Sequence, residues 1–127
     1  MEEGEGGMKA LKVTTDGVIE TIEVSVPLHK TVGKIVGGFE IVRPRRLKRP
    51  LCMIVDDVGL MKGLPFNPVG SYYYQTDMHG SPIVGDIVIM KEQMSYDGID
   101  LIGLEDEEIT ELAIKATHIF KELKLMG

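Results

Sequence analysis

The sequence predicts an α+β fold: an antiparallel-rich sheet of about five strands with a short first helix and a longer C-terminal helix packed on one face. Three features lead to this prediction: β-branched segments around Asp16-Gly17, a nearly continuous apolar segment at residues 83–90, and a C-terminal apolar stripe at helical spacing. The 127 residues are the size of one domain. We therefore predict a single α+β domain over residues 8–127, preceded by a flexible acidic tail at residues 1–7.

The N-terminal part of the domain begins with a predicted hairpin and a short helix. Residues 10–13 and 19–26 are rich in β-branched side chains, and the Asp16-Gly17 pair between them supplies the positive φ of a tight turn. Pro27 suits a first helical turn, and apolar residues then recur at helical spacing until Gly37-Gly38 ends the run. We therefore expect two antiparallel strands followed by a short helix.

The later elements have less uniform signals. Residues 39–42 and 51–55 are predicted strands joined by a loop rich in arginine. Residues 63–82 hold too much glycine and proline for a regular element but are too apolar for a disordered linker, which favours an ordered loop. Residues 83–90 resemble a central strand. Residues 105 to about 125 begin with acidic residues and carry an apolar stripe, which predicts a helix lying on the sheet. The stripe consists of Ile109, Leu112, Ala113, Ala116, Phe120 and Leu123.

Composition limits the class of protein. With 43% hydrophobic and 27% charged residues, the chain has enough apolar side chains to fold without a covalent staple. The single cysteine, Cys52, excludes an intramolecular disulfide, and the N-terminus lacks the pattern of a secretory signal. Apolar runs are far too short for a membrane-spanning helix. We therefore expect a cytoplasmic protein without a membrane partner, and the net charge of −6 argues against a surface that attracts nucleic acid everywhere.

Several short motifs, taken in order, are similar to one known family. They are Met8-Lys9-Ala10 with Asp16-Gly17 and Glu20, Val36-Gly37-Gly38-Phe39-Glu40, Asp57-Val58-Gly59-Leu60 followed by Gly63-Leu64-Pro65-Phe66-Asn67, Ile83-Val84-Gly85-Asp86, and Gly103-Leu104 with Glu108-Ile109. Their order and spacing resemble domain-of-unknown-function family 3846, a small domain of phages, integrated elements and their bacterial hosts. The resemblance runs from Met8 to the last helix. It implies a phage or mobile-element origin, hence the cytoplasm of a host cell, and brings no catalytic residues. The arginine-rich loop and residues 67–82 depart from the family pattern.

Histidine and cysteine give no sign of a metal or nucleophilic site. His29, His79 and His118 lie on three different predicted elements, and a zinc site would need three or four convergent ligands. We expect these histidines to face solvent. Cys52 alternates with Ile54 within a strand, so we expect a small core residue rather than a nucleophile. The chain is therefore predicted to be no enzyme and to hold neither a metal nor a cofactor.

Three aspartates offer an alternative site for a metal ion or for proton transfer. Asp56, Asp57 and Asp86 could meet if their strands adjoin, and convergent carboxylates can hold Mg²⁺ or transfer protons. Asp56-Asp57 before Val58-Gly59 is also ordinary turn chemistry, in which the side chains bond to their own backbone. We favour the turn.

The segment around residues 63–82 offers two further candidates. Asn67 could present its amide to a ligand, or it could bond back to the main chain of a packed turn, and both readings stand. Tyr72, Tyr73 and Tyr74 would point alternately if extended, and could stack on a base or contact a protein. The acidic net charge favours protein contact. These tyrosines, together with apolar residues off the core stripe, lead us to expect a homo-oligomer, specifically a dimer. The off-stripe residues are Ile114, Ile119 and Met126.

Five cations are concentrated between the strands predicted at residues 39–42 and 51–55. They are Arg43, Arg45, Arg46, Lys48 and Arg49. No acid lies between Glu40 and Asp56 to pair with them locally, so the loop is either solvated or an anion site, because guanidinium groups bind phosphate oxygens in bidentate geometry.

Two function classes follow from these features. The first is a non-enzymatic phage or mobile-element accessory protein that binds a host protein or sequesters a small anionic, nucleotide-like ligand, with counter-defence as one such role. The alternative is a nucleic-acid-associated protein that uses the basic loop, and an unrecognised enzyme is a third class.

Overall fold

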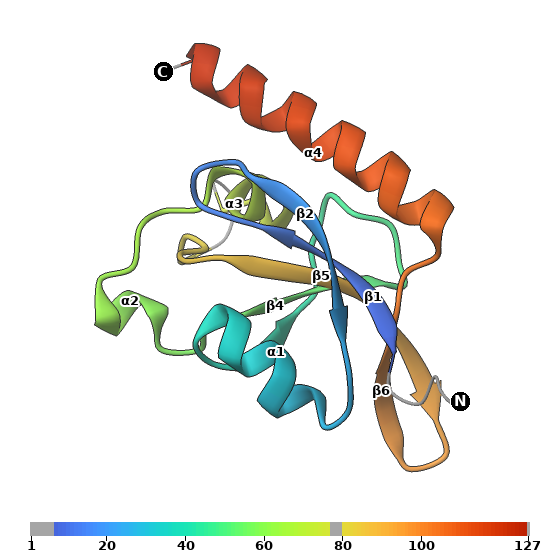
Figure 1. Ribbon diagram of the computed structural model, residues 1–127. Helices are drawn as coiled ribbons and strands as arrows, with labels where there is room; N and C mark the ends of the chain where they lie inside the picture. The colour runs from blue at the N-terminus through green and yellow to red at the C-terminus, as the bar shows by residue number, and fades with distance from the viewer. Residues whose placement is uncertain (1–6, 77–79, 127) are drawn as a thin grey trace.

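The computed structural model describes residues 7–76 and 80–126 (Figure 1). Residues 1–6 of the predicted tail, His79 and the side chain of Met126 lie outside the described residues. The strands are β1 (Met8–Val13), β2 (Ile19–Val24), β3 (Glu40–Val42), β4 (Leu51–Val55), β5 (Ile87–Ser95) and β6 (Gly98–Ile102). The helices are α1 (Leu28–Val36), α2 (Gly59–Lys62), α3 (Pro68–Tyr74) and α4 (Asp106–Met126).

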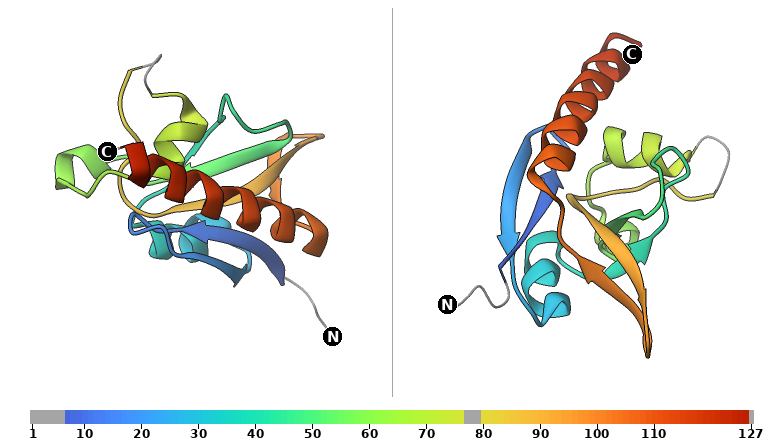
Figure 2. Two further views of the ribbon diagram at one scale, coloured as in Figure 1. Left: turned by 90° about the horizontal axis from the view of Figure 1, so that it is seen from above. Right: turned by 90° about the vertical axis from the view of Figure 1, so that its right-hand side faces the viewer.

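The strands form one antiparallel sheet in the order β2-β1-β5-β4-β3, with β6 paired to the far end of β5. The predicted α+β class, the first hairpin and the long C-terminal helix are confirmed, and so is a central strand, although it covers Ile87–Ser95 and not residues 83–90. β5 is central only in its first half. Its second half leaves the body of the sheet and forms a projecting hairpin with β6 (Figure 2), an element that we did not predict.

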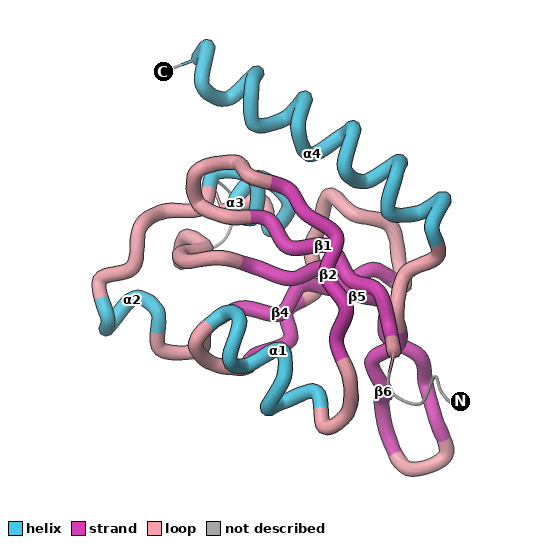
Figure 3. Tube along the Cα trace, viewed as in Figure 1, coloured by secondary structure: helices cyan, strands magenta, loops and turns pink. Residues whose placement is uncertain are grey.

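Helices cover both faces of the sheet, as the views in Figures 2 and 3 show. Alternate residues of β5 enter different cores: Val88 and Met90 pack toward α1, whereas Ile87 and Ile89 pack toward α3 and α4. All four side chains are fully buried. Because β5 is buried on both faces, it is apolar at consecutive positions, and this explains the continuous run in the sequence.

The predicted C-terminal helix lies on the sheet through the stripe that the sequence indicates. Ile109, Leu112 and Ala116 are buried, and Ala113 and Phe120 pack against the same core. The helix begins with Asp106, Glu107 and Glu108, and the Glu108 carboxylate accepts a 2.7 Å hydrogen bond from the backbone N–H of Glu105. No helix among the described residues has the length and apolar character needed to cross a membrane.

The ordered loop that we predicted at residues 63–82 is wrong in part, because its middle forms helix α3. The Asn67 side chain accepts a 2.9 Å hydrogen bond from the N–H of Gly70, and Pro68 occupies the first helical position. An N-cap asparagine followed by proline is a helix-start signal, which the surrounding glycines and prolines obscured.

Tyr73 of α3 offers a test of the core. Its side chain is 2% exposed, burial raises its pKa to about 12, and its hydroxyl has no hydrogen-bond partner among the described residues. A buried, unsatisfied hydroxyl costs free energy, so we expect Tyr73→Phe to increase the free energy of unfolding by about 1 kcal/mol. Urea denaturation followed by circular dichroism measures this change. Tyr96→Phe, at a fully exposed tyrosine, is the control and should leave stability unchanged. A less stable Tyr73→Phe variant would show that the hydroxyl has a partner.

Candidate functional site

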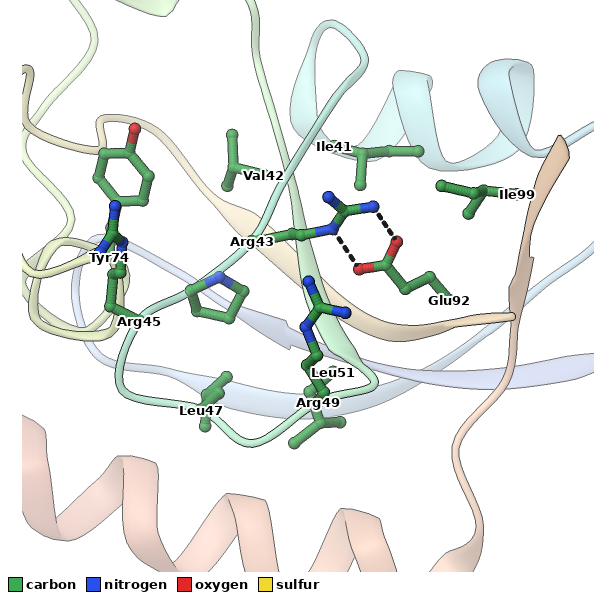
Figure 4. A pocket seen from close by; sticks show the side chains of 11 residues that line it. Ile41, Val42, Arg43, Arg45, Leu47, Arg49, Leu51, Tyr74, Glu92 and Ile99 are labelled. Carbon is green, nitrogen blue, oxygen red and sulfur yellow. Dashed lines mark hydrogen bonds and ion pairs between the residues drawn. The ribbon is translucent and has the colours of Figure 1, made fainter. Parts of the chain in front are cut away.

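The arginine-rich loop frames a large hollow in the described part of the molecule. It lies between the end of β3 and the start of β4 and has a volume of about 850 Å³. Figure 4 shows its cationic, aromatic and aliphatic side chains around one space. The lining consists of Ile41, Val42, Arg43, Pro44, Arg45, Leu47, Arg49, Leu51, Tyr74, Glu92 and Ile99. We call this space the arginine groove. It combines positive charge with an apolar and aromatic surface.

One of the five cations is held by an ion pair that the sequence did not reveal. The Arg43 guanidinium donates two hydrogen bonds, of 2.8 and 3.0 Å, to the Glu92 carboxylate of β5 (Figure 4). The Glu92 side chain is only 12% exposed. Because Arg43 donates to the ionised carboxylate, it lowers the pKa of Glu92, although burial acts in the opposite direction. Strand alternation was the available signal, since it puts Glu92 on the same face as Met90.

A second cation is held against an aromatic ring. The Arg46 guanidinium carbon lies 4.4 Å from the centre of the Tyr72 ring, and the side chain donates a 3.1 Å hydrogen bond to the carbonyl of Tyr72. The backbone N–H of Arg46 donates to the carbonyl of Tyr73. Arg46 therefore fastens the loop to α3.

The other three cations differ from Arg43 and Arg46. Arg45, Lys48 and Arg49 are exposed, and within the described residues no carboxylate lies within ion-pair distance of them. The loop that carries them is nevertheless anchored, because Pro44 is buried, Leu47 packs on the core beneath α4, and Leu51 donates its N–H to the carbonyl of Lys48. The arginine groove thus presents available cations on a backbone that is already ordered.

Asn67 takes the second of the two roles that the sequence left open. The residue is fully buried. Its side-chain amide donates 3.1 and 2.8 Å hydrogen bonds to the carbonyls of Val13 and Gly85, and its oxygen caps α3. Every hydrogen bond of this side chain therefore serves the fold, and the ligand-binding interpretation of Asn67 is corrected to a structural one.

The three tyrosines also need correction as a contact surface. They are helical rather than extended, so consecutive rings do not alternate between two faces. Tyr73 lies in the core, and Tyr72 is exposed but is covered by Arg46 on one face of its ring. Tyr74 lines the arginine groove. Of the three, Tyr74 is the one that belongs to the candidate site.

The remaining sequence candidates that the structure describes lie in separate places. No group of three or more histidine, cysteine or acidic side chains among the described residues could hold a metal ion. His29 and His118 are exposed. Cys52 is buried in the α1 core, and burial raises its thiol pKa to about 12, so it is a core residue as expected.

Asp56 follows the turn interpretation, whereas the Asp57 carboxylate accepts a 3.4 Å hydrogen bond from the N–H of Phe39, which is distant in the sequence. The Asp56 carboxylate accepts a 2.9 Å hydrogen bond from the N–H of Val58, two residues along the chain, and a 2.6 Å bond from the Lys62 ammonium. Asp86 belongs to a different neighbourhood, where it accepts a 3.2 Å hydrogen bond from the N–H of Thr15. The carboxylates of Asp56 and Asp86 therefore stabilise turns.

Comparison with known proteins places the chain in a family. A family model described as a domain of unknown function, DUF3846, matches residues 8–117. No curated protein and no solved structure matches the chain. The matched segment contains the whole sheet, the arginine groove and the first half of α4. Because this match covers most of the chain, the protein belongs to the DUF3846 family.

Proposed function

We propose that this protein binds a small, phosphate-bearing ligand in the arginine groove and carries out no chemistry on it. The observation that carries the proposal is the contrast within the basic loop. Arg43 and Arg46 have protein partners, whereas Arg45, Lys48 and Arg49 stay exposed and, in the described part of the chain, have no carboxylate within ion-pair distance; the charge of Arg49 still acts on Glu92. Guanidinium groups hold phosphate oxygens in bidentate geometry, so such side chains are suited to an anion.

The rest of the lining favours a ligand with a planar or apolar part. The Tyr74 ring and the aliphatic side chains of Leu47 and Leu51 share the groove with the cations. An aromatic base can stack on a tyrosine ring while its phosphates reach arginine. A nucleotide joins these two properties in one small molecule, which supports the nucleotide-like ligand over inorganic phosphate.

Nucleic acid is the second candidate, because the same cations could contact successive phosphates. The net charge of −6 opposes it, since long polyanions respond to the field of the whole protein. Glu92 adds a carboxylate within the groove itself. A role as a phage or mobile-element accessory protein, including counter-defence, agrees with sequestration of a nucleotide-like ligand, and binding to a host protein remains a further prediction.

The test removes two available cations. We expect Arg45→Ala/Arg49→Ala to weaken binding of adenosine triphosphate by about tenfold or more, because two charge-assisted contacts are lost. The melting temperature should barely change, because exposed charges contribute little to stability. Isothermal titration calorimetry measures the affinity, and Lys115→Ala/Lys121→Ala, which removes the same charge from exposed positions on α4, is the matched control.

Salt dependence separates the two candidate ligands. A short single-stranded DNA that bound through the loop would lose affinity steeply with added salt, whereas the nucleotide should saturate one site per chain with a gentler dependence. Equal affinity of the double variant and the wild type for both probes would show that the loop is only a solvated connection.

A further inference from the structure

The β5–β6 hairpin extends beyond the body of the domain and carries apolar side chains at its surface (Figure 2). Met94 is 78% exposed, Ile99 is 46% exposed, and Tyr96 at the turn is fully exposed. Met94 and Ile99 are direct cross-strand partners, so they form one apolar patch in the middle of the arm. Exposed apolar residues are common singly, but a cross-strand pair at mid-arm beside an exposed tyrosine marks a contact surface.

The arm and the Arg43–Glu92 end of the arginine groove lie on one face of the sheet. Residues alternate along β5, so Met94 lies on the same face as Glu92 and as Met90, which packs toward α1. Ile99 borders both features, because it pairs with Met94 and also lines the groove beside Arg43. The apolar patch therefore continues into the Arg43–Glu92 end of the groove.

The charges of the arm complement those of the loop. Asp97 at the turn is exposed, and in the described part of the chain no cation lies within ion-pair distance of it. Arg49 in the groove is likewise exposed and, among the described residues, has no carboxylate within ion-pair distance, although its charge acts on Glu92. The turn of the arm is thus acidic and aromatic, whereas the nearby arginine groove is basic and apolar.

We infer that the arm docks onto the arm of a second copy of this chain, antiparallel and about a twofold axis that passes near Met94. Met94 lies midway between Glu92 at the base and Tyr96 at the turn, which are separated by roughly 14 Å along the strand. Antiparallel alignment about this midpoint places the turn of each arm over the base of the other, as an isologous interface requires. Tyr96 of one copy then reaches Arg43 and Ile41 of the other, and Asp97 approaches Arg49.

This dimer does not rest on the proposed ligand. Its contacts use the Arg43–Glu92 end of the arginine groove and share Arg49 with the proposed ligand site, whereas Arg45 and Tyr74 belong to the ligand site alone. It also differs from the dimer expected from Ile114 and Ile119 on α4, where Ile114 is 66% exposed. Substitutions at Met94 on the arm and at Ile114 on α4 therefore test the two candidate dimer surfaces separately.

Cross-linking through the twofold axis is the first test. Met94→Cys should form an intermolecular disulfide under mild oxidation, because the two copies of residue 94 face each other across the axis. The native Cys52 is fully buried and does not compete. Ile114→Cys is the matched control at another exposed apolar site and should remain monomeric on a non-reducing gel. If the Ile114→Cys variant forms the disulfide-linked dimer and the Met94→Cys variant does not, the arm interface is refuted.

Sedimentation velocity gives an independent readout. The wild type should be a dimer at micromolar concentration, and Met94→Glu should weaken the dimer by about tenfold or more, since it brings two like charges together at the axis. Asp97→Arg should weaken it as well, and Asp97→Arg combined with Arg49→Asp should restore it. Thermal melts should remain at the wild-type temperature because these side chains are exposed. A monomeric wild type, or a dimer insensitive to Met94→Glu, would refute the inference.

Discussion

Replacing Asn67 with aspartate is expected to destabilise this protein by about 3 kcal/mol or more at neutral pH, although the two side chains have the same shape. The Asn67 amide nitrogen donates to the carbonyl oxygens of Val13 and Gly85 at 3.1 and 2.8 Å. A carboxylate oxygen in that place faces two carbonyl oxygens with no proton to share. It also brings a charge into a site with no solvent exposure.

The effect is large because one side chain joins three segments. Asn67 connects the end of β1, the turn before β5 and the start of α3, and its own N–H donates to the carbonyl of Ile83. Asn67→Ala should cost about 2 to 3 kcal/mol, because the helix cap is lost and two buried carbonyls lose their donor. Both values are a large fraction of the roughly 5 to 15 kcal/mol that stabilises a typical domain.

Urea denaturation at pH 7 measures these differences. Gln93→Glu is the matched control, because it makes the same amide-to-carboxylate change at an exposed site on the arm and should stay within about 0.5 kcal/mol of wild type. The Asn67→Asp variant should regain part of its stability in mild acid, where a protonated carboxyl can donate one hydrogen bond. Wild-type stability in both Asn67 variants would return Asn67 to the list of ligand-binding candidates.

Strong periodicity explains which elements the sequence predicted. The stripe on α4, the Asp16-Gly17 turn and the apolar run of β5 each express a local rule over many residues, and all three match the structure. Gly17 shows how specific that turn is: its φ is +83°, and a Cβ there would lie 2.5 Å from the Phe120 ring of α4. The glycine thus serves both the hairpin and the packing of the last helix.

The parts that were missed depend on contacts distant in sequence or on competing local signals. The five cations between Arg43 and Arg49 have no acid nearby in the sequence, yet Glu92 pairs with Arg43 across 49 positions. The pairing of β3 with β4, and of β4 with β5, brings the two together. Strand β6 was missed because it is short, largely exposed and begins with glycine, and its pairing with β5 supplies the order instead.

The sequence therefore predicted which segment forms the candidate site, but not how the side chains of that segment are arranged. The sequence identified the basic loop, and the structure divides its side chains into those that hold the loop and those that remain available. Asn67 and Tyr73 were misplaced for one reason. A short helix begins at Pro68, and it takes the side chains of its N-cap, Asn67, and of Tyr73 in its second turn into the interior.

Asp56 provides the second large effect, in which stability and pH are linked. Its carboxylate has no exposed surface. It accepts hydrogen bonds from the Val58 N–H and from Lys62, whose ammonium also donates to the carbonyl of Gly37 at the end of α1. We expect Asp56→Ala to destabilise the protein by about 3 kcal/mol, because the turn before α2 and the bridge to α1 are lost together.

The pH dependence follows from the direction of the pKa shift. Burial acts to raise the pKa of Asp56, but the hydrogen bonds from Lys62 and Val58 prevail and lower it below the ordinary value of 3.8. The charged form is therefore favoured by folding. Its contribution is fully present above the ordinary pKa and is lost as the pH falls through the lower folded value. Glu92 and Glu108 have lowered pKa values as well and act in the same direction.

The conservative variant Asp56→Asn isolates the charge. Its side-chain oxygen can still accept from Val58, so at pH 7 it should lose less stability than Asp56→Ala, about 1 to 2 kcal/mol. Between pH 5 and 3 its stability should fall less steeply than that of the wild type, because one of the linked protons has been removed while those of Glu92 and Glu108 remain. Asp57→Asn, at the exposed neighbouring carboxylate, is the control and should keep the wild-type slope. Identical slopes for Asp56→Asn and the wild type would mean that folding does not lower the pKa of Asp56, and would contradict the role given to its hydrogen bonds from Lys62 and Val58.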